Sequence, residues 1–206
     1  IDIPLEAVML KTSDGVDNFP LLAIPFFVLT GGLMAEGGTA RRLVALAQIF
    51  VGFIRGGLAL VNIVASTMFG CISGSSVADT ASIGSVMIPQ MVKAGYPRIY
   101  ATNVTICGSV QALMIPPSHN AVIYSIAAGG TVSVAHLFLA GIFPGLLFGL
   151  CLMGLVLWTA HRRQLPVSEP VPLSEVPRIV REALWGLVTV FIIMGGILSG
   201  VFTPTE

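Results

Sequence analysis

Two short interruptions break otherwise apolar stretches of the chain, and both hold residues that can place oxygen atoms around a cation. The first is Ser73-Gly74-Ser75-Ser76, where Gly74 is free to adopt a positive φ and the hydroxyls can bond released backbone groups. The second is Pro116-Pro117-Ser118, where two missing backbone donors leave the preceding carbonyls without helical partners. A sodium ion prefers oxygen ligands, so we predict that both interruptions contribute to an ion site.

Each interruption also has a simpler interpretation. Small residues such as those from Ser73 to Ser76 often serve close packing between membrane helices, and a double proline can merely kink the helix that contains it. Helix N-termini that follow a break favour an anionic group, so we assign to substrate binding the polar residues at these positions: Ser76, Ser118, His119 and Asn120. An interhelical hydrogen bond is the alternative for His119 and Asn120.

Asp79 is the only acidic residue between Glu36 and Glu169, and it follows the first interruption closely. An ionisable residue inside a membrane segment is a functional candidate by default. We favour a capping role, in which the carboxylate accepts hydrogen bonds from the N–H groups that begin the next helix near residues 80–83. The alternative is that Asp79 contacts the ion or lends it charge. Asn62 is interpreted as a buried amide bonded to its neighbours.

The composition requires a membrane as solvent. Hydrophobic residues make up 55% of the 206 residues, charged residues 10%, and the mean hydropathy is +0.93, far from the values of a soluble domain. The formal net charge of zero argues against nucleic acid as a partner. The cysteines Cys71, Cys107 and Cys151 lie in apolar segments without paired spacing, so we expect small core side chains rather than a disulfide or metal site.

The pattern of apolar segments and basic residues predicts an all-α polytopic membrane protein. Arg55, Lys93, Arg98 and Arg162-Arg163 all fall on the cytoplasmic side if excess positive charge stays inside. With both of its ends on that side, segment 58–91 must enter and leave by the same face as a re-entrant hairpin. The other expected elements are a span at 19–35, an interfacial helix at 41–55, a broken span at 99–128, a span at 134–160, a cytoplasmic connector at 164–182 that ends in a short surface helix, and a span at 183–206.

Several ordered motifs resemble the large permease subunit, of DctM type, of tripartite ATP-independent periplasmic (TRAP) transporters. The resemblance runs nearly end to end. It rests on Phe19-Pro20-Leu21-Leu22-Ala23-Ile24-Pro25-Phe26-Phe27, Ser73-Gly74-Ser75-Ser76-Val77-Ala78-Asp79, Ile88-Pro89, Gly95-Tyr96-Pro97, Ile115-Pro116-Pro117-Ser118 and Gly200-Val201-Phe202-Thr203-Pro204-Thr205-Glu206.

The resemblance implies an elevator-type secondary transporter of the bacterial inner membrane. Such a transporter is not an enzyme, uses sodium as its coupling ion without other cofactors, and imports organic anions such as C4-dicarboxylates, sialic acid or other sugar acids. A DctP-like periplasmic solute-binding protein delivers the substrate, and a DctQ-like small membrane subunit braces the scaffold. Residues 1–163 would form most of the first inverted repeat, and residues 183–206 would begin the second. The chain would therefore be a fragment of a longer permease, which agrees with its start at Ile1.

Carried over by position, the first hairpin tip falls on Ser73, Gly74, Ser75 and Ser76 with Asp79 behind it, and the discontinuous helix falls on Pro116 and Pro117. These residues are the expected ion ligands. Segment 111–114 and the pair His119-Asn120 depart from the family pattern. Two rival interpretations are a membrane protease using Ser75 and His119, and a non-transporting scaffold or passive channel.

Overall fold

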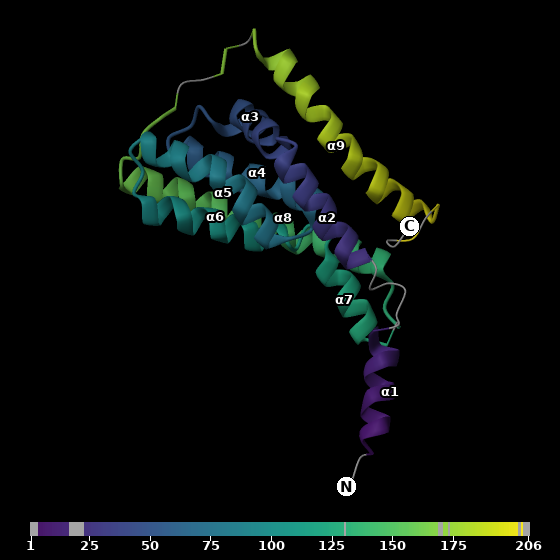
Figure 1. Cartoon of the computed structure of the whole chain (residues 1–206). Helices are drawn as coiled ribbons and strands as arrows, with labels where there is room; N and C mark the ends of the chain where they lie inside the picture. Colours follow the sequence, from purple (N-terminus) through teal and green to yellow (C-terminus); the bar gives the residue numbers. More distant parts are fainter. Residues whose placement is uncertain are drawn as a thin grey trace.

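The computed structural model describes residues 4–16, 23–129, 131–168, 171–172, 174–201 and 203. In these residues every regular element is an α-helix, which confirms the all-α prediction (Figure 1). A single isolated β-bridge pairs Arg55 with Val167. Residues 17–22 lie outside the described part, so the first four positions of the expected span 19–35 do too; the helix described there is α2 (Ala23–Glu36).

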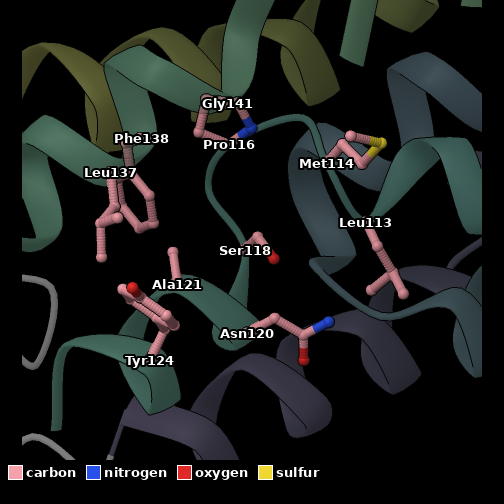
Figure 2. Close-up of a pocket in the computed structure, with 10 residues that line it drawn as sticks. All are labelled: Leu113, Met114, Pro116, Ser118, Asn120, Ala121, Tyr124, Leu137, Phe138 and Gly141. Atoms are coloured by element: carbon pink, nitrogen blue, oxygen red, sulfur yellow. The ribbon is translucent and has the colours of Figure 1, made fainter. Parts of the chain in front are cut away.

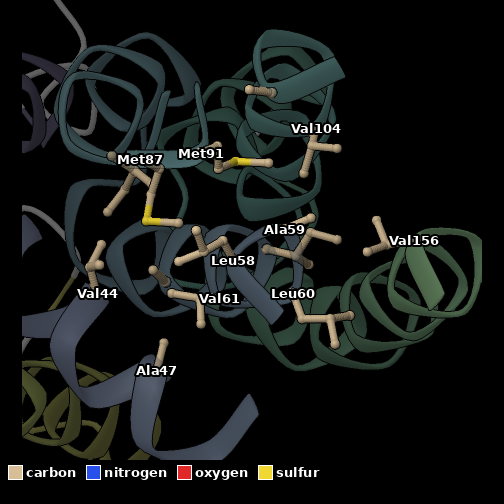
Figure 3. Packing of buried hydrophobic residues seen from close by; sticks show 14 of the residues in the cluster. Val44, Ala47, Leu58, Ala59, Leu60, Val61, Met87, Met91, Val104 and Val156 are labelled. Carbon is tan, nitrogen blue, oxygen red and sulfur yellow. The ribbon is translucent and has the colours of Figure 1, made fainter. Parts of the chain in front are cut away.

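The centre of the molecule is a bundle of α4 (Gly57–Ser73), α5 (Ser76–Lys93) and α6 (Arg98–Ala112). Asn62 of α4 contacts Thr105 of α6, and Gly70 packs against Ala112 two turns later, so α4 and α6 run parallel. Asn62 also contacts Met91 near the end of α5, which therefore runs antiparallel to both. Leu58, Ala59, Met87, Met91 and Val104 are among the apolar side chains that fill the interior (Figure 3).

Helix α3 (Thr39–Val51) packs on the outside of this bundle. Its apolar face buries Leu43, Leu46 and Ala47, which recur at helical spacing in the sequence. The helix ends at Val51, four residues before the end of the expected element 41–55, because Gly52 and the turn at residues 52–56 follow. Phe50 belongs to the same sequence pattern but remains exposed.

Two further helices are long and apolar enough to cross a membrane: α8 (Val134–Arg162) and α9 (Val176–Ser199). The expected short surface helix before the last span is wrong, because α9 is one continuous helix that begins at Val176 inside the expected connector 164–182. Pro177 sits in the first turn, where its missing donor costs nothing, and so does not separate two helices. Helix α1 (Leu5–Val16) extends away from the bundle near α7, and α9 packs against α3 and α4 (Figure 1).

One end of the bundle gathers the turns that carry basic residues. Arg55 donates a hydrogen bond to Gln164, and the hydroxyl of Tyr96 donates to the carbonyl oxygen of Pro166 at 3.3 Å. The turn before α4, the turn before α6 and the segment after α8 are therefore tied together. Much of the outer surface is apolar, with Phe143, Trp185 and Phe191 each about three-quarters exposed, as expected for lipid contact.

Candidate functional site

The first interruption is a tight turn between α4 and α5. Gly74 ends α4 with a φ of 59°, and its N–H donates to the carbonyl oxygen of Gly70 at 2.9 Å. This left-handed conformation is easily adopted by glycine, which explains its place in the motif. Ser75 then adopts an extended conformation as the N-cap of α5, and its hydroxyl accepts a hydrogen bond from the N–H of Ala78 at 3.4 Å. The turn therefore reverses the chain within two residues.

The second interruption separates α6 from α7 (His119–Ala127). The chain tightens after Ala112, with the N–H of Met114 donating to Gln111 and that of Ile115 donating to Ala112. Pro116 and Pro117 then supply no donors, so the helical ladder stops there. Helix α7 begins after Ser118, which has extended backbone and makes no side-chain capping bond.

The two interruptions touch each other. A Cβ placed on Gly74 would lie 3.0 Å from the carbonyl oxygen of Pro117 and 3.5 Å from the backbone nitrogen of His119. One turn earlier in α4, a Cβ on Gly70 would come within 2.9 Å of the backbone of Ala112 in α6. The C-terminal ends of α4 and α6 and the N-terminal ends of α5 and α7 therefore meet at one place. Helix C-termini carry partial negative charge and N-termini carry partial positive charge.

The predicted site residues are distributed around this meeting point with different exposure. Ser73 and Ser118 are buried, Ser76 and His119 are half-buried, and Asn120 is exposed. The hydroxyl of Ser118 and the Nδ1 atom of His119 are buried without a hydrogen-bond partner among the described residues. These polar atoms are available to a ligand at the break.

A cavity of about 310 Å³ opens on the α7–α8 side of the second interruption (Figure 2). Ser118, Asn120 and Tyr124 supply its polar side chains. The rest of its wall is mainly apolar, formed by Leu113, Met114, Pro116, Ala121, Leu137, Phe138 and Gly141. Ser118 and Asn120, both predicted to bind substrate, therefore border one cavity.

Helix α8 packs against the second interruption and the end of α6 through a row of glycines, Gly141, Gly145 and Gly149. A Cβ on Gly141 would lie 2.6 Å from the carbonyl oxygen of Met114, and one on Gly145 would lie 2.8 Å from Ile115. The amide of Gln111 donates to the carbonyl oxygen of Gly145 at 3.0 Å. On its other side, this amide accepts a bond from the hydroxyl of Thr67 in α4 at 2.9 Å. Gln111 thus links α4, α6 and α8 just before the break.

The favoured capping role of Asp79 is wrong, because Ser75 caps α5 instead. The Asp79 side chain turns into the bundle, where it is completely buried and its Oδ2 atom accepts a hydrogen bond from the Ser109 hydroxyl at 2.6 Å. Ser75 precedes the helix in extended conformation, so its hydroxyl reaches the free N–H groups first.

Buried polar residues that the sequence interpretation missed lie on α4, α5 and α6. The sequence predicts a bonded buried amide at Asn62, and its Nδ2 atom does donate to the Thr105 hydroxyl at 2.7 Å. Pairs of polar residues three or four apart on each of the three helices were the available signal. The group consists of Asn62 and Ser66 in α4, Asp79 and Ser82 in α5, and Thr105 and Ser109 in α6.

The protease interpretation finds no support in these contacts. Gly74 lies against the backbone of Pro117 and His119, but no hydrogen bond joins Ser75 and His119 in the described structure. The Ser75 hydroxyl instead caps α5. A serine nucleophile needs an adjacent base within hydrogen-bonding reach.

Comparison with known proteins gives one consistent family. The family described as "Tripartite ATP-independent periplasmic transporter, DctM component" matches residues 1–206. The uncharacterized protein YgiK of Salmonella typhimurium is 49% identical over 100% of the chain and 47% of its own length. The C4-dicarboxylate TRAP transporter large permease protein DctM of Pseudomonas aeruginosa is 44% identical over 98% of the chain and 47% of its own length.

A third relative extends the chemical range of the group. The 2,3-diketo-L-gulonate TRAP transporter large permease protein YiaN of Escherichia coli is 40% identical over 94% of the chain and 45% of its own length. The chain thus spans a little less than half the length of these relatives.

Proposed function

The chain belongs to the DctM family of TRAP transporter permeases, and we propose that it forms the first half of a sodium-coupled importer of organic anions. This is a family of transporters rather than enzymes, which removes the protease alternative. The observation that supports the proposal most directly is the contact of Gly74 with Pro117 and His119, where the two interruptions meet.

The C-terminal helix ends at this contact supply ligands suited to sodium. The last carbonyls of α4 and those preceding Pro116 and Pro117 lack the donors of a continuing helix. The hydroxyls of Ser73, Ser75 and Ser76 lie in the same turn. Unwound carbonyls joined by hydroxyl groups are the ligands with which broken-helix transporters coordinate sodium. In this proposal Asp79 acts from behind the turn rather than in it.

The N-terminal helix ends suit the anionic substrate. Helices α5 and α7 both begin at the contact, so their free N–H groups and partial positive charge favour a carboxylate there. Ser76, Ser118, His119 and Asn120 stand at these helix starts and would add side-chain donors. The named substrates of two relatives, C4-dicarboxylates and 2,3-diketo-L-gulonate, are organic acids, and we extend that class to this chain.

The complete transporter needs parts beyond this chain. We propose that an inverted second repeat supplies the opposing half of the ion and substrate sites, as the doubled length of the relatives allows. A small membrane subunit and a periplasmic solute-binding protein complete the system named by the family, which would act as a multi-pass elevator in the bacterial inner membrane. Helices α4 and α5 would be the re-entrant hairpin.

Uptake by the complete permease tests this function. The permease, its small subunit and its solute-binding protein are reconstituted in proteoliposomes, and labelled organic acids are supplied with and without an inward sodium gradient. We expect accumulation against a substrate gradient only when sodium drives it. Accumulation that persists without a sodium gradient would remove the coupling, and equilibration without accumulation would favour the passive channel.

A further inference from the structure

We infer that a groove between α6 and α8 binds an anionic phospholipid, with an acyl chain between the two helices and the phosphate at Arg163. The groove has a volume of about 140 Å³, and its wall includes Tyr100, Asn103 and Cys107 of α6 and Leu152, Leu155 and Thr159 of α8. It lies far from the second interruption, because Tyr100 precedes Ala112 by twelve residues, or about 18 Å along the helix axis. The inference therefore concerns neither the proposed ion site nor the proposed substrate site.

The packing of α6 against α8 changes along the two helices and leaves this groove open. Near the second interruption the helices approach closely, since a Cβ on Gly149 would lie 3.1 Å from the amide nitrogen of Gln111. Nearer the other end, a Cβ on Gly154 would meet nothing within 4 Å, and Leu152 and Leu155 line the space instead. Small residues allow close approach of two helices, and larger ones keep them apart.

The wall of the groove suits a hydrocarbon chain. It is mainly apolar, and the buried side chains of Val104 and Val156 close it towards the interior of the bundle. Leu155 is 57% exposed, and Asn103 and Cys107 are exposed as well, so the groove opens at the outer surface. In a membrane this surface faces lipid chains. An acyl chain can therefore enter the groove from the side.

One end of the groove carries a positive charge and an unsatisfied hydroxyl. Arg163 lies near enough to Tyr100 for its charge to act on the hydroxyl, which is buried without a hydrogen-bond partner among the described residues. Within the described part of the chain the one ion pair joins Arg178 and Glu182, so Arg163 has no acidic partner there. A lipid phosphate would satisfy both groups, because it accepts a hydrogen bond from the hydroxyl and pairs with the guanidinium.

The position of this charge favours a phospholipid over a free anion. Basic pockets between membrane helices on the cytoplasmic side bind anionic lipid headgroups, and Arg163 follows α8 at the end of the bundle that gathers the basic turns. The apolar groove beside Arg163 adds affinity that inorganic phosphate cannot gain, since each buried methylene group contributes to binding. The neighbouring Arg162 is placed differently, with its guanidinium 5.3 Å from the ring centre of Trp158, which does not line the groove.

Lipid binding to the complete permease tests the groove without any measurement of uptake. The permease is stripped of lipid in detergent and titrated with dioleoyl phosphatidylglycerol or dioleoyl phosphatidylcholine, and native mass spectrometry gives the dissociation constant of the first bound lipid. We expect phosphatidylglycerol to bind roughly tenfold more tightly, as for one charge-assisted contact. Arg163→Gln should remove this preference. Arg162→Gln is the matched control, with the same loss of charge one residue away, and should keep it.

A second pair of variants tests the groove itself. Cys107→Phe places a ring in the groove and should weaken the binding of both lipids roughly tenfold. Ile106→Phe, at an exposed position outside the groove, should bind them like wild type. Both positions are exposed, so the melting temperature of the lipid-free permease should stay the same in the two variants.

Three results would overturn the inference. Equal affinity for the two lipids would mean that the headgroup is not recognised, and equal effects of Arg162→Gln and Arg163→Gln would mean that only the general surface charge matters. Lipid binding that Cys107→Phe leaves unchanged would mean that another part of the permease covers the groove. Loss of sodium-coupled uptake with an intact lipid preference would instead count against the proposed function alone.

Discussion

At the scale of single residues, backbone conformation decides where the two interruptions can meet. Gly74 has a φ of 59°, and a Cβ added to it would lie 3.0 Å from the carbonyl oxygen of Pro117, so both its torsion angle and its missing side chain matter. Ser75 satisfies the start of α5, which leaves Asp79 free to turn into the bundle. Neighbours in the sequence therefore serve different purposes: one shapes the turn, one caps the helix, and one places a carboxylate among buried hydroxyls.

Gly74→Ala tests the contact between the interruptions. We expect a loss of stability of about 1 kcal/mol from the left-handed conformation, and a roughly tenfold rise in the sodium concentration for half-maximal uptake as the turn is pushed from Pro117. The control is Gly129→Ala, because Gly129 has a φ of 70° with nothing within 4 Å of its Cβ position. Thermal unfolding should respond similarly in both variants. An equal change in sodium dependence would contradict a role for the contact.

At the scale of elements, the interruption after α6 is held by its neighbours as much as by its prolines. Helix α8 presents Gly141 and Gly145 to it, and the Gln111 amide joins α6 to Thr67 and to the α8 backbone. Small residues on one helix allow the backbone of another to approach closely. The position of the carbonyls before Pro116 therefore depends on glycines of α8, a separate helix that begins at Val134.

Gly145→Ala should disturb this arrangement. The added methyl group would lie 2.8 Å from Ile115, and overpacking of this kind costs about 1 to 3 kcal/mol. We expect a lower melting temperature and weaker sodium-dependent uptake. Gly154→Ala on the same helix meets nothing within 4 Å and should be neutral or gain up to about 1 kcal/mol from helix propensity. Equal behaviour of the two variants would show that α8 does not position the break.

At the scale of the whole molecule, basic turns gather at one end. The turn at Arg55, the turn before Arg98 and the segment after Arg162 are tied together by hydrogen bonds. Positive loops stay on the cytoplasmic side, so the contacts agree with a single cytoplasmic end. Gly129 and Thr131 belong to the connection between α7 and α8, which we expect on the opposite side.

Cysteine labelling in intact cells tests this orientation. Cys71, Cys107 and Cys151 are replaced by alanine in the complete permease, and Lys93→Cys or Thr131→Cys is then introduced at an exposed position. A membrane-impermeant maleimide should label Thr131→Cys from the periplasm, whereas Lys93→Cys should react only after the membrane is opened. The reverse pattern would invert the proposed topology.

The sequence by itself determined that the protein is an apolar, all-helical membrane protein and where its two interruptions fall. Its apolar composition, the paired prolines and the Ser-Gly-Ser-Ser turn all act locally, through solvent preference and backbone freedom, so the all-helical architecture could be predicted from them. The family could be recognised from the sequence for the same reason, since its motifs lie along a single chain in fixed order. The continuous α9 was missed because a proline in the first turn of a helix looks the same in sequence as one in a connector.

Only the tertiary structure decided which of these residues meet. Contact between Gly74 and Pro117 joins positions more than forty residues apart, and no periodicity in the sequence fixes how α4 and α6 align. The direction of Asp79 depends on Ser109, a residue of another helix, whereas sequence reasoning could weigh only its neighbours in the chain. Packing of parallel α4 and α6 against antiparallel α5 therefore buries serines, an asparagine, a threonine and the carboxylate of Asp79 between the same three helices.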